Sequence, residues 1–358
     1  MAMPKSDLDV LDTPAVLVDL DVARRNIERF QSYADAHGLK VRPHIKTHKL
    51  PAMAAMQLEA GAIGITCQKV SEAEAMVAGG ADINDVLITY NILGAEKLEH
   101  LRQLARRVTL SVVADNPTVV NGLSAAFAQE PVPLRVLVEC NTGADRCGVA
   151  SPEAAAELAH QIVAAAGLSF GGLMTYPPVN GAAAVQDFMT RTKLLLAKDG
   201  IDVPVISSGG SPSMMTAADA PVTTEYRPGT YVYNDRSLVA RGVCGWDDCA
   251  LTVLATVVSV PSPNRAIIDS GSKILTSDLL GLAGHGHVLG RPDITVDQLS
   301  EEHGRLVSDG PIGLVVGNRV RIVPNHACVV TNMVDAVHLL EHGAVIGLWP
   351  VVARGKVT

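Results

Sequence analysis

The chain has 358 residues, of which 48% are hydrophobic and 18% charged, so it is long enough for one large domain or two. Its net charge of −8, without any long run of lysine and arginine, argues against a nucleic-acid-binding protein. No apolar stretch approaches the about 20 residues of a membrane span, no signal peptide is recognised, and the six cysteines lack CxxC spacing, so a cytoplasmic protein without a membrane partner is expected.

Short apolar strands alternate with helical patterns through the first two thirds of the chain. Strands are predicted at 15–20, 39–46, 61–67, 86–89, 108–113, 134–139, 170–175 and 203–207. Helices are predicted at 22–37, 52–59, 71–79, 95–105, 116–127, 152–166 and 185–197, the third of them starting with a capping box of Ser71 and Glu74. This alternation indicates a parallel sheet, and its count favours an α/β fold with a closed (β/α)8 TIM-like barrel over residues 1–238.

The pattern changes after about residue 240. Strands joined by turns rich in Gly, Pro and Asp are predicted at 251–260, 265–269, 313–316, 319–323, 334–340 and 344–348. No helical pattern interrupts them. A mostly β C-terminal domain over residues 239–358 is therefore expected.

The segment 41–49 reads as the end of a strand entering a loop, because Leu50-Pro51 then breaks the backbone. Its side chains His44, Lys46 and His48 would share one face if the segment is extended. A lysine beside other cations in a partly dry pocket has its neutral amine favoured, as a Schiff-base nucleophile requires. The alternative is a basic, solvated strand end.

Polar residues follow several other predicted strands, where a barrel carries its chemistry. Ser208-Gly209-Gly210 precedes a helix-compatible run, so its backbone could approach a phosphate, although such a pair is more often a plain turn. Arg146 follows the strand ending at Glu139 and suits an oxyanion, with a surface salt bridge to Asp145 as the alternative. Tyr176 follows the strand at 170–175.

Two later motifs are weaker candidates. In one, Gly229 and Thr230 could donate hydrogen bonds to a phosphate and Arg227 could meet a ring nitrogen, although such a motif is more often an ordinary Pro-Gly turn. In the other, His326 and Cys328 are two apart in a segment expected to be extended, so both could bind one divalent cation such as zinc. Two protein ligands leave positions open for substrate, although a His-x-Cys sequence is also common by chance.

Together these motifs resemble the D-threonine aldolase and D-serine dehydratase family, whose members have the alanine racemase-like fold of pyridoxal phosphate (PLP) enzymes. The resemblance spans nearly the whole chain. It is carried by the residues at 13–14, 42–49, 67–74, 145–148, 209–210, 229–231, 302–304 and 324–328.

The resemblance implies a role for each candidate. Lys46 would bind PLP covalently, Arg146 would meet its phenolic oxygen, and Arg227 would approach the pyridine nitrogen. The phosphate would be held by the turns that contain Ser208, Gly209, Gly210, Gly229 and Thr230. His326 and Cys328 would bind Zn²⁺ or Mn²⁺ near the substrate hydroxyl. A homodimer is also implied by the family.

The implied activity is a PLP- and metal-dependent lyase that cleaves D-3-hydroxy amino acids such as D-threonine to glycine and an aldehyde. A dehydratase acting on D-serine or D-threo-3-hydroxyaspartate is the alternative, followed by a racemase and by a PLP carrier without enzymatic activity. Such aldolases tend to carry a histidine shortly after the residue matching Tyr176, and residues 177–182 contain none. His44, Tyr176 or a metal-bound hydroxide would then serve as the base.

Overall fold

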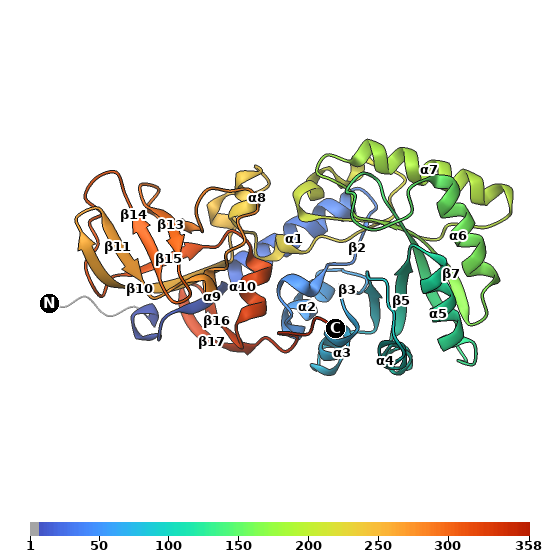
Figure 1. Cartoon of the computed structure of the whole chain (residues 1–358), viewed down its shortest axis with the longest axis horizontal. Helices are drawn as coiled ribbons and strands as arrows, with labels where there is room; N and C mark the ends of the chain where they lie inside the picture. Colours follow the sequence, from blue (N-terminus) through green and yellow to red (C-terminus); the bar gives the residue numbers. More distant parts are fainter. Residues whose placement is uncertain (1–6) are drawn as a thin grey trace. The chain divides into compact units, whose positions relative to one another are not determined.

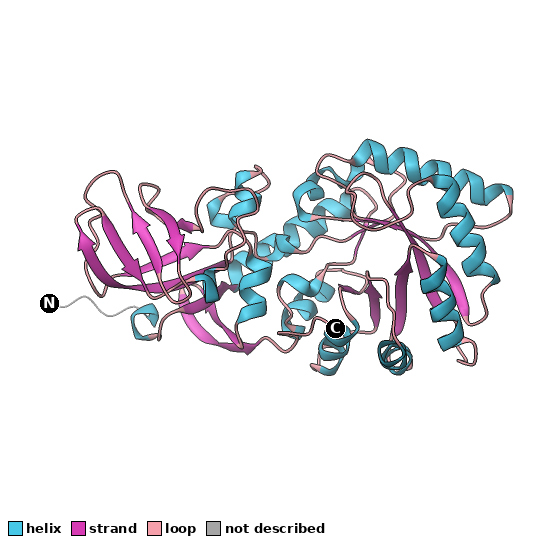
Figure 2. Cartoon of the chain, in the orientation of Figure 1, coloured by secondary structure: helices cyan, strands magenta, loops and turns pink. Residues whose placement is uncertain are grey.

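The computed structural model describes residues 7–358, which divide into two compact units. The barrel unit contains Glu28–Lys46, Pro51–Gly229 and Lys356–Thr358. The sheet unit contains the described chain up to Ile27, with Thr47–Leu50 and Thr230–Gly355. Figures 1 and 2 show helices around the strands of the barrel unit and mainly strands in the sheet unit.

Eight parallel strands form the core of the barrel unit. They are β2 (Lys40–Val41), β3 (Ile65–Cys67), β4 (Asp85–Ile88), β5 (Thr109–Ala114), β6 (Leu134–Cys140), β7 (Leu168–Thr175), β8 (Ile206–Ser208) and β9 (Glu225–Tyr226). The sheet runs in the order β2-β9-β8-β7-β6-β5-β4-β3, and a parallel bridge joins His44, just beyond β2, to Thr66 of β3. The amide of Thr66 also donates to the carbonyl of Pro43 across 2.8 Å. The two edges therefore meet, which confirms the predicted (β/α)8 barrel.

Helices connect successive strands, as predicted. They are α2 (Pro51–Glu59), α3 (Val70–Ala78), α4 (Ala95–Ala105), α5 (Pro117–Phe127), α6 (Pro152–Ala164) and α7 (Ala182–Lys198), followed by the 3-10 segment η3 (Ser211–Asp219). Asn116 and Ser151 cap α5 and α6 through their side chains. The predicted capping box is wrong, because α3 begins one residue earlier, after Lys69, without a side-chain cap.

Apolar side chains from four neighbouring strands meet inside the barrel unit. They are Leu87, Val113, Leu137 and Met174, each no more than 2% exposed. Because side chains alternate along a strand, Glu139 lies on the same face of β6 as Leu137, two residues closer to the strand's carboxyl end. A polar side chain thus follows the apolar core toward the carboxyl ends of the strands.

The sheet unit holds nine strands in the order β11-β14-β13-β12-β15-β10-β1-β16-β17. They are β1 (Ala15–Asp19), β10 (Leu251–Ser262), β11 (Arg265–Ile268), β12 (His287–Val288), β13 (Thr295–Leu299), β14 (Gly304–Val307), β15 (Arg319–Val323), β16 (Ala336–Glu341) and β17 (Ala344–Pro350). β1 pairs with β10 and β16, so its expected place in the barrel is wrong. The reason is burial, since Ala15 and Leu17 pack against Leu254 and Leu340.

Short helices interrupt the sheet unit, contrary to the expectation that it has none. They are α8 (Arg236–Ala240), α9 (Ser272–Leu275) and α10 (Ala327–Met333), with 3-10 segments η1 (Asp7–Val10), η4 (Thr230–Val232) and η5 (Trp246–Asp248). The strand predicted at 313–316 does not form. α1 (Leu20–Ala36) follows β1, and its second half belongs to the barrel unit, where Phe30 packs on Tyr226.

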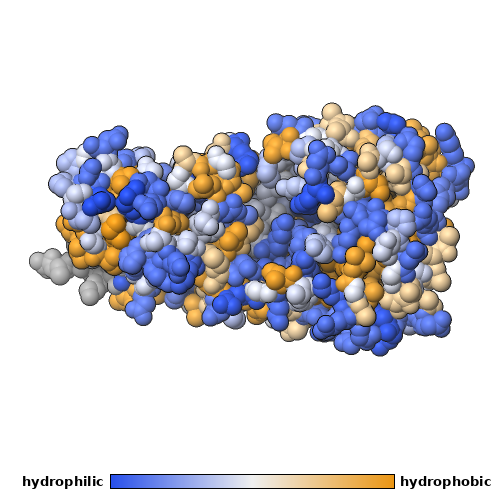
Figure 3. Space-filling view, viewed as in Figure 1, coloured by the Kyte–Doolittle hydropathy of each residue, from blue (hydrophilic) through white to orange (hydrophobic). Residues whose placement is uncertain are grey.

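Large apolar side chains on the surface occur singly or in small groups. Among the most exposed are Val132, Leu194 and Val315, which come from different parts of the chain. Figure 3 shows hydrophilic residues between such groups on the visible face. Within residues 7–358, no helix has both the length and the apolarity needed to cross a bilayer.

Candidate active site

The segment around Lys46 has a different conformation from the one predicted. β2 ends at Val41, and Ile45–Thr47 forms the 3-10 segment η2, so His44, Lys46 and His48 do not share one face of a strand. Lys46 itself is half-buried and lies in η2, beyond the carboxyl end of β2.

His44 is held in one orientation in the barrel unit. Gln68 donates its amide to the carbonyl of Thr89 across 2.8 Å, so its oxygen accepts from Nε2 of His44 across 3.1 Å. Nδ1 of His44 then accepts from the backbone amide of Lys46 across 3.4 Å. The buried imidazole thus fixes the backbone at Lys46. The role of Gln68 was missed, because the sequence gives no signal for this contact.

His48 belongs to the sheet unit and is fully buried. Its Nδ1 accepts from the amide of Leu50 across 3.1 Å, and its ring meets that of Tyr233 edge-on. These contacts give His48 a role in packing.

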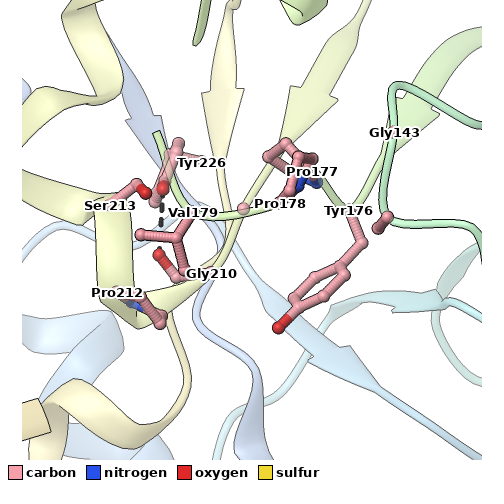
Figure 4. A pocket seen from close by; sticks show the side chains of 11 residues that line it. Gly143, Tyr176, Pro177, Pro178, Val179, Gly210, Pro212, Ser213 and Tyr226 are labelled. Atoms are coloured by element: carbon pink, nitrogen blue, oxygen red, sulfur yellow. Dashed lines mark hydrogen bonds between the residues drawn. The ribbon is translucent and has the colours of Figure 1, made fainter. Parts of the chain in front are cut away.

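A cavity of about 300 Å³ opens beside the strand ends of the barrel unit, a size within the range of small-molecule sites. Its lining comes from the segments that follow β6, β7 and β8 and from the end of β9: Gly143, Ala144, Tyr176, Pro177, Pro178, Val179, Gly209, Gly210, Pro212, Ser213 and Tyr226. Figure 4 shows Tyr176 and Gly210 among these residues. The guanidinium of Arg146 lies 4.6 Å from the ring centre of Tyr176. The structure therefore brings Arg146, Tyr176 and the predicted glycine turn together, whereas Lys46 is not part of this lining.

The glycine turn after β8 has little room for side chains. A Cβ atom on Gly209 would lie 2.7 Å from the carbonyl oxygen of Arg227, and Gly210 has a φ of 142°. The hydroxyl of Tyr226 donates to the carbonyl of Gly210 across 2.9 Å (Figure 4). This bond fixes the turn while η3 begins directly after it, with Ser208 buried just before. Tyr226 was another residue that the sequence did not single out.

Arg227 makes two side-chain hydrogen bonds beside this turn. It donates to the carbonyl of Thr175 across 2.8 Å and to the hydroxyl of Ser207, which in turn donates to Glu225. Burial lowers the pKa of Arg227 to about 10, although Glu225 opposes that shift. Arg227 therefore remains a cation, and the buried carboxylate of Glu225 stabilises its positive charge.

Glu139 is a second buried carboxyl at these strand ends, only 5% exposed. Burial and the nearby charge of Asp115 raise its pKa to about 7, and Arg146 and Arg227 oppose that shift. A carboxyl that changes protonation near neutral pH is suited to proton transfer or to fixing a neighbouring guanidinium.

The pair Gly229 and Thr230 divides between the two units. The amide of Gly229 donates to the hydroxyl of buried Ser211 across 3.1 Å. The hydroxyl of Thr230 instead lies 3.6 Å from Sγ of Cys328, within the sheet unit. The hydroxyl expected to bind phosphate is thus in contact with the predicted metal-binding thiol.

His326 and Cys328 are brought together, but not on a strand. His326 is the N-terminal cap position of α10 and Cys328 lies in its first turn, so the prediction of an extended segment is wrong. Burial lowers the pKa of His326, but its hydrogen bond to Cys328 and its contact with Asp278 raise that pKa to about 9 overall. Nδ1 of His326 lies 2.7 Å from Asp278, and the hydroxyl of Thr47 lies 3.2 Å from Sγ of Cys328.

These donor sets fit the two groups that the sequence implied. An imidazole and a thiol together suit zinc and similar borderline cations. Among residues 7–358, no group of three or more His, Cys, Asp or Glu residues meets the geometry of a metal site. A cation here would therefore keep open positions. In the barrel unit, the cavity with its glycine edge fits a small phosphorylated ligand.

Comparison with known proteins supports this interpretation. The alanine racemase N-terminal domain matches residues 18–237, and the serine dehydratase domain matches residues 250–340. A D-threonine aldolase from an Arthrobacter species is 35% identical over 99% of this chain and 96% of its own length. These matches define an enzyme with the alanine racemase-like fold.

Solved structures agree with this class. The D-threonine aldolase of Filomicrobium marinum has a TM-score of 0.91 at 34% identity, covering 98% of both chains. A cysteine-to-alanine mutant of D-threo-3-hydroxyaspartate dehydratase, described as the metal-free form, has a TM-score of 0.87 at 29% identity, covering 97% of this chain and 99% of its own. The chain belongs to the D-threonine aldolase and D-serine dehydratase family, a family of PLP-dependent lyases.

Proposed function

We propose that the chain is a PLP- and divalent-metal-dependent D-threonine aldolase, which cleaves D-3-hydroxy amino acids to glycine and an aldehyde. The observation that carries this proposal is the pairing of His326 with Cys328, whose nitrogen and sulfur suit a divalent cation. A metal can bind a substrate hydroxyl, which both lyase reactions require and racemisation does not. Close similarity to a D-threonine aldolase over 99% of the chain favours cleavage of the carbon–carbon bond.

The proposed cofactor residues lie mainly in the barrel unit. Lys46 would hold PLP covalently, Arg146 and Tyr176 would flank it, and Gly209 with Gly210 would leave room for its phosphate. PLP supplies an electron sink for negative charge at Cα when it is bound. The turn with Ser208, the amide of Gly229 and the hydroxyl of Thr230 complete the proposed phosphate contacts. Arg227 would present its remaining hydrogen-bonding capacity to the ring nitrogen.

The proposed metal ligands His326 and Cys328 lie in the sheet unit. Zn²⁺ or Mn²⁺ would act there as a Lewis acid on the hydroxyl of the substrate. Hydroxyl groups from Thr47 and Thr230 lie 3.2 and 3.6 Å from Sγ of Cys328, so both can stabilise a thiolate by donating to it. Thr47 directly follows Lys46 in the sequence, which supports a common task for the two motifs.

Tyr176 and His44 are proposed to have different tasks. Tyr176 lines the cavity and its side chain is exposed, so its phenol can hold or move a proton at the substrate. Nε2 of His44 donates to Gln68 and Nδ1 accepts from the amide of Lys46, so His44 is proposed to orient the lysine segment.

The second candidate is a dehydratase that forms a 2-oxo acid and ammonia. One specific observation favours it: residues 177–182 contain no histidine to act as the base of an aldolase. The similarity to D-threo-3-hydroxyaspartate dehydratase is consistent with this alternative.

Product analysis distinguishes the two candidates. Purified protein with PLP and Mn²⁺ is incubated with D-threonine, D-serine and D-threo-3-hydroxyaspartate, and glycine, aldehyde and 2-oxo acid are assayed together. We expect glycine and acetaldehyde from D-threonine, and no turnover in a chelator until Mn²⁺ or Zn²⁺ is restored. A 2-oxo acid as the main product would establish the dehydratase, and full activity in the chelator would contradict the metal.

The remaining proposals concern organisation. A homodimer is proposed from the family resemblance alone, and light scattering on the purified protein measures the oligomeric state. A cytoplasmic location is proposed from the six cysteines without CxxC spacing, and no nucleic-acid partner is proposed because the net charge is −8. A domain boundary near residue 238 is supported by the two family matches, which end at 237 and begin at 250.

A further inference from the structure

The proposed metal ligand His326 makes a close contact with a carboxylate through its other ring nitrogen. Nδ1 lies 2.7 Å from Oδ2 of Asp278. A carboxylate accepts hydrogen bonds and cannot donate them, so Nδ1 carries the proton and donates it. In that tautomer the lone pair is on Nε2, which can then bind a cation.

Helix capping does not explain this arrangement. His326 occupies the cap position of α10, but its side chain makes no capping bond. The amide of Ala327 is instead bonded to Oδ2 of Asp235 across 3.1 Å, and Asp235 is fully buried. The helix start is therefore satisfied by another residue, which leaves the imidazole available for ligation.

Asp278 is itself fixed by the loop that carries it. Its amide donates to the hydroxyl of Thr276 across 3.1 Å, and its Oδ1 accepts from the amide of Leu280 across 3.4 Å. Its carbonyl accepts from Asn325, the neighbour of His326 in the chain, across 3.4 Å. Three contacts thus hold Asp278 while its Oδ2 lies against the histidine.

The loop also contains two residues in an unfavourable backbone conformation. Thr276 has a φ of 65° and Leu280 a φ of 48°, although side chains of these types rarely adopt positive φ. Residues in such conformations persist only where the surrounding contacts hold them, and they concentrate at functional sites. The loop keeps this conformation on both sides of Asp278.

We propose that Asp278 is the positioning residue of the metal site: it holds His326 in the tautomer and orientation in which Nε2 binds a divalent cation of the zinc class. The inference rests on the metal step of the proposed function. Its Oδ2 contacts Nδ1 of His326, and no group of three possible ligands is found among residues 7–358, so it is not proposed as a third ligand. It acts through His326.

Zinc affinity tests this proposal without depending on turnover. Zn²⁺ binding is measured on the PLP-loaded enzyme by competition with a chromophoric chelator. Asp278→Asn keeps the shape of the side chain but loses its charge, and we expect about 10- to 100-fold weaker Zn²⁺ binding, as is usual for such partners. Asp293→Asn is the matched control, since Asp293 forms a surface pair with Arg291 2.7 Å away, and its affinity should be unchanged.

A measurement on the wild type removes any dependence on the folding of the variant. Zinc-loaded protein with ¹⁵N-labelled histidine should show the His326 ring protonated at Nδ1 and bound through Nε2, with His326→Ala identifying the signal. Zinc on Nδ1, or equal affinity in wild type and Asp278→Asn, overturns the proposal. A wild-type enzyme that binds no zinc overturns the metal step of the proposed function and this inference with it, which separates the two failures.

Discussion

The ammonium group of Lys49 donates to the carbonyl oxygen of Ala353 across 3.1 Å, and the side chain is buried. Two lysines, Lys46 and Lys49, lie close together in the same motif. This bond gives Lys49 a structural role within the sheet unit. Lys46 is instead the last residue of the segment Glu28–Lys46, which belongs to the barrel unit. The two lysines therefore have different tasks.

We expect Lys46→Ala to abolish the visible absorption of bound PLP, because no other amine should replace it. Lys49→Ala should keep that absorption and lower the free energy of unfolding by about 1–3 kcal/mol, since a buried carbonyl loses a charged donor. Absorption spectra and urea unfolding of both variants check this. If Lys49→Ala loses the absorption and Lys46→Ala keeps it, the assignment of the lysine is wrong.

Tyr226→Phe tests whether the glycine turn holds the phosphate. The change removes only the hydroxyl that donates to Gly210 across 2.9 Å. A lost hydrogen bond of about 1 kcal/mol corresponds to about fivefold weaker PLP binding if the turn holds the cofactor. Titration of PLP into the cofactor-free protein measures this. An unchanged PLP affinity would place the phosphate elsewhere.

Glu139→Gln tests whether the pKa of this buried carboxyl is raised. Since its pKa in the folded state is raised from 4.5 to about 7, the folded protein binds more protons than the unfolded chain between these values. The stability contributed by the protonated carboxyl is therefore present below about pH 4.5 and is lost as the pH rises through about 7, by up to about 3 kcal/mol.

Urea unfolding at about pH 5 and about pH 8 measures this effect. The wild type should lose more stability over this interval than Glu139→Gln, which cannot ionise. Glu157→Gln, at an exposed position on α6, is the control and should behave as the wild type. The same loss in all three proteins would contradict the raised pKa.

Arg42 joins two carboxylates in the barrel unit. Its Nε lies 2.9 Å from buried Glu225 and its Nη1 lies 2.6 Å from Asp85. Arg42→Ala leaves the carboxylate of Glu225 buried without the cation that bonds to it directly, so we expect a loss of about 3–5 kcal/mol in the free energy of unfolding. Arg42→Ala with Glu225→Gln should lose less than Arg42→Ala alone. Equal losses would show that charge burial is not the cause.

The barrel could be predicted from the sequence because its pattern is local. Each strand is a short apolar run and each helix has its own period, so their order follows from the chain. β1 could not be placed in this way, since it resembles the barrel strands and only its pairing with β10 and β16 assigns it to the other sheet. α10 was missed because Val329, Val330 and Thr331 are β-branched, which favours a strand.

The candidate site likewise contains residues that the sequence could predict and residues that it could not. Lys46, Arg146, Tyr176 and the glycine turn follow strands, so the architecture alone indicated their common edge. Asp278 could not be predicted, because it lies 48 residues before His326 and meets it only through a loop with positive φ values. Contacts of this kind depend on the folded chain.

The fate of the Cα hydrogen tests the central claim most directly. D-threonine carrying deuterium at Cα is incubated with the enzyme, PLP and Mn²⁺ in ordinary water. The deuterium content of each product is then measured by mass spectrometry. Cleavage between Cα and Cβ leaves the bond from Cα to deuterium intact, so the account predicts glycine that retains the deuterium, together with acetaldehyde. A 2-oxo acid without deuterium, or threonine that has lost its label, would contradict it in favour of a dehydratase or a racemase.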